Sequence, residues 1–145
     1  MAKPFAGVHL HHIARETEDV QSLVRFYEEV LGFNRIETPS FGAMEVVWLS
    51  LPPSFSLHII QRSGEAHLPE SPWNAAPNSR KDPSKLPAGH HLSFCVADYD
   101  ACISILRERQ IPFFEKTQQN GKIRQAFFFD PDGNGLEIGN WPIPS

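Results

Sequence analysis

Two matching stretches of this chain decide its fold: HIARETED at residues 12–19 and HLSFCVAD at residues 91–98. Each begins with a histidine, continues as a strand-like run, and reaches a helix-capping aspartate seven positions after the histidine. The two histidines lie 79 residues apart, and so do the two aspartates. The same strand-to-helix joint therefore occurs twice, which predicts an internal duplication of the chain.

The segments that follow the two joints also match each other. A helix is expected near Asp19–Leu31, because its apolar residues recur at helical spacing. The corresponding helix of the second half carries Cys102, Ile105 and Leu106. The expected strands are Val8–Arg15, two or three within Asn34–Gln61, His90–Ala97, Ile111–Lys116, Lys122–Phe129 and Leu136–Asn140. Both halves therefore follow the order βαβββ, and the chain is predicted to have an α+β fold.

A proline-rich stretch separates the two halves. Five of the thirteen prolines fall there, which favours a long connection over a regular helix or a central strand. These prolines are Pro69, Pro72, Pro77, Pro83 and Pro87. We therefore expect one domain over residues 1–145, with a first module at about 8–61, a linker at about 62–89 and a second module at about 90–141.

Composition excludes several classes of partner. The net charge is -4 and the thirteen basic residues are scattered, so binding to nucleic acid or to a membrane surface is not expected. The chain has no apolar run of membrane-spanning length, and its N-terminus lacks the apolar segment of a signal peptide. A cytoplasmic protein is therefore expected. Cys95 and Cys102 lie among apolar residues and are expected to be small buried side chains rather than a disulfide or a zinc site.

A second repeated feature lies near the end of each half. There, a short apolar strand carries one polar residue, His58 in the first half and Glu137 in the second. These residues are again 79 positions apart, and each follows His12 or His91 of its own half by 46 positions. A single histidine on a strand is more commonly structural, but the joint spacing favours a metal site. Three imidazoles and one carboxylate suit Zn²⁺, Ni²⁺, Co²⁺, Fe²⁺ or Mn²⁺ and leave one or two positions for water or substrate.

Strand alternation predicts which residues surround these four positions. The residues expected to share their faces are Ser93 and Cys95 beside His91, Leu10, Ala14 and Glu16 beside His12, and Arg62 beside His58. The remaining histidines, which we interpret as bystanders, are His9, His11, His67 and His90. Alternation is expected to point His11 and His90 to the opposite face.

Further motifs accompany the two joints: Phe26-Tyr27, Leu31-Gly32-Phe33, Gly89-His90-His91 and the turn from Asp130 to Gly135 before Glu137. With them, the chain resembles the vicinal oxygen chelate superfamily, and within it the plant-type, single-chain glyoxalase I-like proteins. The resemblance implies that the paired modules form an open eight-stranded mixed barrel around one divalent metal ion. It also implies a homodimer in which the first half of one subunit and the second half of its partner build each site.

The resemblance carries ligand positions onto this chain: they are His12, His58, His91 and Glu137. Glyoxalase I has a glutamate at the place of His58, an arginine that binds a glutathione carboxylate at the place of Glu16, and an asparagine at the place of Arg62. A carboxylate in place of an anion-binding arginine reverses the local charge. We therefore expect an enzyme that does not use glutathione.

The chemistry implied is proton transfer beside a carbonyl group, assisted by the metal as a Lewis acid. Glu137 is the expected base and Glu16 a possible second base. The residues expected to line the substrate pocket are Arg62, Trp48, Phe127 and Phe129, with Trp141 beside them. The predicted activity is a glutathione-independent isomerase or aromatising enzyme acting on an apolar enone of specialised metabolism.

Three alternatives stay open at this point. A true lactoylglutathione lyase would keep the fold and the metal but would need Arg62 or a linker residue to bind the glutathione anion. An extradiol-type dioxygenase uses two histidines and one glutamate on Fe²⁺, and a fourth ligand at His58 would crowd its oxygen site. A small-molecule-binding protein without catalysis is the third.

Overall fold

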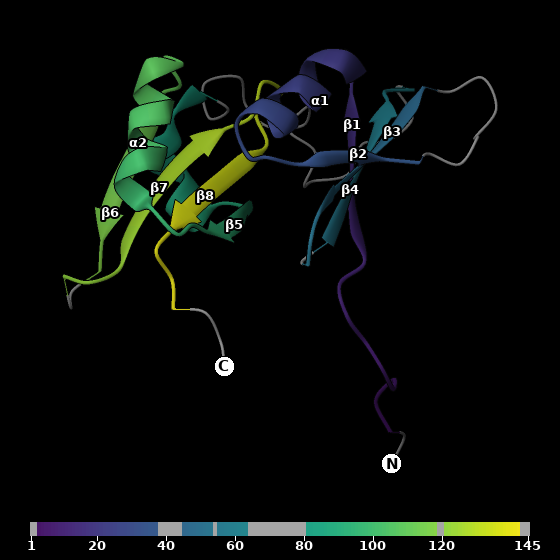
Figure 1. The fold of residues 1–145 in the computed structure, drawn as a ribbon, viewed down its shortest axis with the longest axis horizontal. Helices are drawn as coiled ribbons and strands as arrows, with labels where there is room; N and C mark the ends of the chain where they lie inside the picture. The colour runs from purple at the N-terminus through teal and green to yellow at the C-terminus, as the bar shows by residue number, and fades with distance from the viewer. Residues whose placement is uncertain (1–2, 38–44, 54, 64–80, 119–120, 143–145) are drawn as a thin grey trace. The chain divides into compact units, whose positions relative to one another are not determined.

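The computed structural model describes residues 3–37, 45–53, 55–63, 81–118 and 121–142 (Figure 1). The chain divides into a first unit, Met1–Glu65, and a second unit, Ala66–Ser145. The first unit contains β1 (His12–Thr17), α1 (Val20–Glu29), β2 (Asn34–Ile36), β3 (Val46–Leu51) and β4 (Phe55–Gln61). The second unit contains η3 (Pro83–Ala88), β5 (His91–Cys95), α2 (Tyr99–Glu108), β6 (Phe113–Thr117), β7 (Arg124–Phe129) and β8 (Gly135–Gly139). The linker residues outside the described ranges include Pro69, Pro72, Pro77 and His67.

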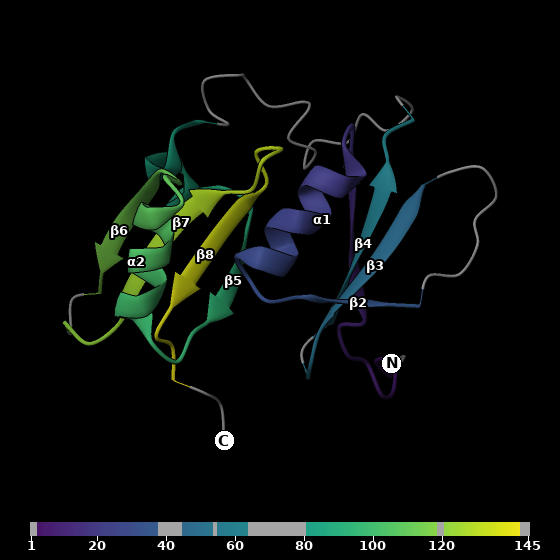
Figure 2. The same cartoon turned by 45° about the horizontal axis from the view of Figure 1, so that its top comes forward.

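The predicted α+β fold of two βαβββ modules is confirmed. The first sheet has the order β1-β4-β3-β2 and the second has the order β5-β8-β7-β6 (Figure 2). In each sheet the first strand pairs in parallel with the last, and the remaining pairs are antiparallel. Ala14 pairs with His58, and Ser93 pairs with Glu137. The spacing of 79 residues found in the sequence is therefore also the register equivalence of the two sheets.

The two helices begin with the same capping interaction. The Asp19 carboxylate accepts a hydrogen bond from the Ser22 backbone N–H at 3.0 Å, and the Asp98 carboxylate accepts one from the Ala101 backbone N–H at 3.0 Å. An N-cap acceptor satisfies a backbone donor that the helix itself leaves without a partner. Both capping aspartates expected from the sequence are confirmed, and they fix where the chain turns from strand to helix.

Each helix covers one face of its sheet with apolar side chains. The buried residues of the first unit are Val20, Leu23, Val24 and Tyr27 on α1, Leu49 on β3, and Leu57 and Ile59 on β4. Those of the second unit include Tyr99, Ile103 and Leu106 on α2, with Phe94, Ala126, Phe128, Leu136 and Ile138 on the strands. Each fully buried side chain of this size stabilises the fold by about 1.5–3 kcal/mol. Ile105, expected on the apolar side of α2, is instead 39% exposed, because the buried stripe runs through Ile103 and Leu106.

The opposite face of each sheet, called the site face from here on, carries the predicted functional residues. Side chains alternate along a strand, so His58 points away from the face that buries Leu57 and Ile59. In the same way, Glu137 points away from the face of Leu136 and Ile138. The site faces are therefore set by the same apolar pattern that packs the helices.

The end of the expected linker forms a short helix in the second unit. In η3, the Asp82 carboxylate accepts from the Ser84 backbone N–H at 3.1 Å, and Leu86 is buried. The element contacts β6, β7 and β8. Proline at the start of a helix loses no hydrogen bond, which is why this proline-rich segment can form a helical turn.

The cysteines depart from the expectation that both are buried. Cys95 is exposed and Cys102 is half-buried. Cys95 lies on the site face with His91, whereas Phe94 beside it points into the core. Burial raises the pKa of the Cys102 thiol. Across the described ranges, neither helix is both long and apolar enough to cross a membrane.

Candidate metal site in two halves

The second unit brings His91 and Glu137 together on its site face. His91 Nε2 lies 3.3 Å from Glu137 Oε1, and Glu137 is only 3% exposed. His91 Nδ1 lies 2.9 Å from the carbonyl oxygen of Gly89. Because a carbonyl oxygen only accepts, Nδ1 carries the proton of a neutral His91, and Nε2 then presents its lone pair toward the carboxylate.

This pair has the chemistry of two metal ligands. A histidine that binds a metal through one nitrogen commonly donates from the other to a backbone carbonyl, as His91 does to Gly89. Two donor atoms at about 2.0–2.2 Å from one ion lie about 3–3.5 Å apart. The separation of 3.3 Å between His91 Nε2 and Glu137 Oε1 fits that range.

Three further side chains hold the Glu137 carboxylate in place. Oε2 accepts hydrogen bonds from Ser93 Oγ and, at 2.8 Å, from Trp141 Nε1. Oε1 accepts from Gln125 Nε2 at 3.1 Å. Sequence reasoning placed Ser93 on the face of His91 but assigned it no role, and it did not identify Gln125. Their signal in the sequence was only that both are polar residues inside otherwise apolar strands.

The first unit brings His12 and His58 to its site face together with Trp48. The two imidazole centroids are 5.9 Å apart, and the Trp48 ring stacks on His58 at 4.5 Å with an interplanar angle of 16°. Two imidazoles on one ion have centroids about 4.5–6 Å apart for metal–nitrogen bonds of about 2.0–2.1 Å. Burial, and secondly the nearby His12, lower the pKa of His58, so this imidazole is neutral at pH 7, the form that binds metals.

His11 does not point away from His12, as the sequence analysis expected. His11 Nδ1 lies 2.9 Å from His12 Nδ1, and the His11 ring centroid lies 6.4 Å from that of Trp48. The strand begins only at His12, so strand alternation does not apply to the residue before it. His11 is therefore a contact of a predicted ligand rather than a bystander.

Arg62 and Glu16 form one charged group on the first unit. Arg62 Nη1 lies 3.1 Å from Glu18 Oε1, and Arg62 Nε lies 3.9 Å from Glu16 Oε1. Arg62 and Glu16 are half-buried, with exposed side-chain fractions of 25% and 18%. One guanidinium therefore lies beside two carboxylates on the first unit.

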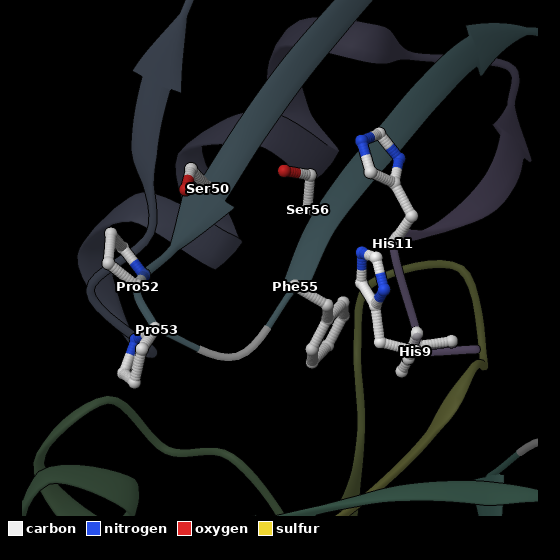
Figure 3. A pocket seen from close by; sticks show the side chains of 8 residues that line it. His9, His11, Ser50, Pro52, Pro53, Phe55 and Ser56 are labelled. Carbon is white, nitrogen blue, oxygen red and sulfur yellow. The ribbon is translucent and has the colours of Figure 1, made fainter. Parts of the chain in front are cut away.

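An open cavity of about 280 Å³ continues the site face of the first unit past His12 (Figure 3). It is lined by His9, Leu10, His11, Ser50, Pro52, Pro53, Phe55 and Ser56. Ser56 is the register partner of His12, so the cavity begins in the same row as this predicted ligand. Figure 3 shows the rings of His9 and His11 on one side of it and the two prolines on another.

The aromatic residues expected to line the substrate pocket are not among the lining residues of this cavity. Trp48 contacts His12 and His58, and Trp141 contacts Glu137. Phe127 is buried at 1% exposure with its ring centroid 5.4 Å from that of His91, and Phe129 is half-buried near the end of β7. Trp48, Trp141 and Phe127 therefore contact predicted ligands, and none of the four side chains lines the cavity of Figure 3.

Each unit thus supplies two of the four predicted ligands. Within the described ranges of the chain, no group of three or more His, Cys, Asp or Glu side chains is arranged to hold a metal ion. The donor types and the spacing within each pair fit a divalent transition metal.

The duplicated βαβββ order and its two four-stranded mixed sheets are a glyoxalase-type fold. The chain belongs to the Glyoxalase/Bleomycin resistance protein/Dioxygenase superfamily, whose family description matches residues 9–138. This is the family expected from the sequence motifs.

Individual relatives support that assignment. The chain is 29% identical over 136 residues to "Glyoxylase I 4" of Arabidopsis thaliana, covering 90% of this chain and 70% of the relative. It is 26% identical over 163 residues to 2-epi-5-epi-valiolone epimerase of an Actinomyces species, covering 94% and 81%. A crystal structure of a glyoxalase/dioxygenase from Nostoc punctiforme has the same fold, with a TM-score of 0.70 at 22% identity, covering 99% of this chain and 97% of that one.

Proposed function

We propose that this protein is a metal-dependent enzyme that moves a proton beside a carbonyl group of a small substrate without using glutathione. The observation that carries the proposal is the equivalence of the two ligand pairs. His12 with His58 and His91 with Glu137 occupy the same register positions in two copies of one sheet. A structural role for a single histidine would not require this repetition.

In this proposal, His12, His58, His91 and Glu137 hold one divalent ion, with Zn²⁺, Ni²⁺, Co²⁺, Fe²⁺ and Mn²⁺ as candidates. When bound, the ion supplies a Lewis acid that stabilises negative charge on a substrate carbonyl oxygen. The neutral state of His58 supports its role as a ligand. Binding by both pairs would join the two halves of the repeat into one functional centre.

Glu137 is proposed to take the proton. Its carboxylate removes a proton from the carbon beside the carbonyl, and the electron pair of the broken C–H bond moves toward the carbonyl oxygen. The same proton returns to another carbon of the enolate, so the net reaction is an isomerisation. Glu16 is the second candidate base, because it is half-buried and shares a face of β1 with His12.

The proposed substrate is an apolar, uncharged enone. Arg62 already lies beside Glu16 and Glu18, and these two carboxylates disfavour the approach of the carboxylates of glutathione. The cavity beside His12 mixes apolar walls, such as Phe55, with hydroxyl groups such as Ser56. Such a lining suits a small ring that carries a few oxygen atoms.

The two curated relatives favour different versions of proton-transfer chemistry. An epimerase inverts one stereocentre, and the relative of that name is 26% identical to this chain. The 29% identical relative named "Glyoxylase I 4" favours a second candidate, a true lactoylglutathione lyase. Activity on methylglyoxal that requires glutathione would select this second candidate.

The deciding experiment combines metal analysis with an activity panel. Purified protein is analysed for bound transition metals and then assayed on cyclic enones with and without glutathione. We expect about one ion per pair of half-sites and turnover that glutathione does not change. Absence of a transition metal after loading with each candidate ion, or turnover only with glutathione, would contradict the proposal.

We further propose a homodimer, in which the two half-sites of one centre come from two subunits. Light scattering of the metal-loaded protein at micromolar concentration is expected to give about twice the chain mass of 16.4 kDa. A stable mass near that of one chain would contradict the dimer. It would not contradict the ligand assignment, which metal analysis tests separately.

A further inference from the structure

The Glu137 carboxylate accepts a hydrogen bond from a residue that follows the last strand of the second sheet. Trp141 follows β8, yet its indole N–H donates to Glu137 Oε2 at 2.8 Å. The backbone carbonyl of Trp141 accepts from Cys95 Sγ at 3.0 Å, at the end of β5. The residue is therefore fixed at two points, with its backbone on β5 and its ring on the carboxylate.

Gly139 leaves the space that this indole occupies. A Cβ at Gly139 would lie 2.6 Å from Trp141 Nε1 and 2.9 Å from Trp141 Cδ1. Real Cβ atoms essentially never lie within 3.0 Å of such atoms, so a larger residue at this position is expected to displace the indole from Glu137. The contact with Glu137 thus depends on a glycine two positions before the tryptophan.

The indole decides which carboxylate oxygen faces His91. Each carboxylate oxygen has about two lone-pair positions. Oε2 uses both for Ser93 and Trp141, whereas Oε1 accepts from Gln125 and lies 3.3 Å from His91 Nε2. Oε1 is therefore the oxygen that remains available toward His91.

We propose that Trp141 is a positioning residue for Glu137, which it holds so that Oε1 faces His91. The inference rests on the proposed function, because it takes Glu137 to be a metal ligand. An indole N–H donates but does not accept, and it binds no metal. Trp141 therefore acts only through the carboxylate, and Gly139 is proposed to act through Trp141, although a Cβ there would also lie 3.3 Å from the Arg124 carbonyl oxygen.

The first test uses the metal-free protein and does not depend on activity. The indole N–H signals of the three tryptophans are recorded by ¹H–¹⁵N NMR, and the signal lost in Trp141→Phe identifies Trp141. We expect Glu137→Gln and Gly139→Ala each to shift this signal upfield as the charge-assisted hydrogen bond weakens. An unchanged Trp141 signal in Glu137→Gln would overturn the proposal.

The second test measures Co²⁺ affinity by the visible absorption of the bound ion. Trp141→Phe keeps a ring but lacks the donor, and it is expected to weaken Co²⁺ binding about 10- to 100-fold, as is usual for residues that orient a ligand. Gly139→Ala is expected to weaken binding to a similar degree. Affinity within about twofold of the parent protein in both variants would overturn the proposal.

A double variant separates positioning from a general loss of packing. If Gly139 acts through the indole, Gly139→Ala weakens Co²⁺ binding in the parent protein but not in a Trp141→Ala background. Equal weakening in both backgrounds would show that the alanine perturbs the sheet itself and would count against the proposal. If the parent protein binds no divalent metal, the proposed function fails, and the NMR signal alone then decides whether the indole holds Glu137.

Discussion

The two units share one scaffold, but they hold their functional side chains differently. The row of Ala14, His58 and Trp48 in the first sheet is equivalent to the row of Ser93, Glu137 and Phe127 in the second. Glu137 is buried and accepts hydrogen bonds from three side chains, whereas His58 is half-buried and stacks on an indole ring. A charged group in a buried position needs donors around it, and a neutral imidazole needs fewer.

The segments before the first strand of each sheet differ as well. In the second unit, η3 places Leu86 against Gly135, where a Cβ would lie 2.4 Å from Leu86 Cδ2. The equivalent position in the first unit is Ser56, which lines the cavity beside His12. The two copies therefore share the positions of the predicted ligands, but the second packs a leucine where the first has an open cavity.

The largest expected effect comes from removing a ligand of the anchored pair. His91→Ala is expected to lose most of the bound metal, because one of four donors disappears from a site whose other donors stay in place. Metal content after gel filtration measures this loss. His90→Ala is the matched control, since His90 is an exposed neighbour in the chain and is expected to keep full occupancy. Full occupancy in His91→Ala would show that the pair of the second unit does not bind the ion.

The next effect tests which unit supplies the base. Glu137→Gln keeps the shape and a weak oxygen ligand but loses basicity, and it is expected to lower the rate by roughly 10²–10⁴. Glu16→Gln is expected to cost far less. Steady-state kinetics on an active enone, together with metal content, measure both variants. If Glu16→Gln is the inactive variant and Glu137→Gln turns over, the base belongs to the first unit.

The sequence predicted those parts of the fold and site that depend on local periodicity. The repeat spacing of 79 residues, both helix caps and the strand order all follow from patterns of single residues. The pairing of His91 with Glu137 followed from the same spacing. These features were predictable because the residue pattern within each helix and strand favours the same structure that the whole fold adopts.

The features that sequence reasoning missed depend on the path of the chain outside regular strands. His11 contacts His12 because strand alternation starts one residue later. Trp141 reaches Glu137 because its indole lies against Gly139, which has no side chain. Leu86 is buried because a helical turn forms within a proline-rich segment. No periodic pattern encodes such tertiary contacts.

A smaller effect concerns a contact found in the second unit alone. The Tyr99 hydroxyl donates to Gln125 O at 3.0 Å and lies 2.9 Å from Glu115 Oε2, while the equivalent position in the first unit is Val20. Tyr99→Phe is expected to lower the free energy of unfolding by about 1–2 kcal/mol at pH 7, because a buried hydrogen bond is lost. Urea unfolding measures the difference.

The same tyrosine predicts a pH dependence. Burial, followed by the hydrogen bond and charge of Glu115, raises the pKa of Tyr99. Its stabilising contribution is therefore complete below the ordinary tyrosine pKa near 10 and is lost as the pH rises above that value. Between pH 9 and about 11, the parent protein is expected to lose more stability than Tyr99→Phe. Parallel pH profiles for the two proteins would contradict this assignment.

The smallest effect compares the two helix caps directly. Asp19→Ala and Asp98→Ala each remove an acceptor from a backbone N–H at 3.0 Å, and each is expected to cost about 0.5–2 kcal/mol. The caps are not fully equivalent, because α2 has Asp100 in its first turn and α1 has no acidic residue there. Negative charge near a helix N-terminus is worth about 0.3–1 kcal/mol.

Asp98→Ala therefore keeps part of the electrostatic stabilisation, and Asp19→Ala is expected to be the more costly change by a few tenths of a kcal/mol. The corresponding asparagine variants keep the acceptor and lose only the charge, so Asp19→Asn is expected to recover most of the loss. Chemical unfolding of the four variants at low and high salt measures these differences. Because salt screens the charge term and leaves the hydrogen bond intact, the gap between the two alanine variants should narrow at high salt. If the gap has the opposite sign, or if salt does not change it, then the acidic first turn of α2 does not compensate for the loss of the Asp98 cap.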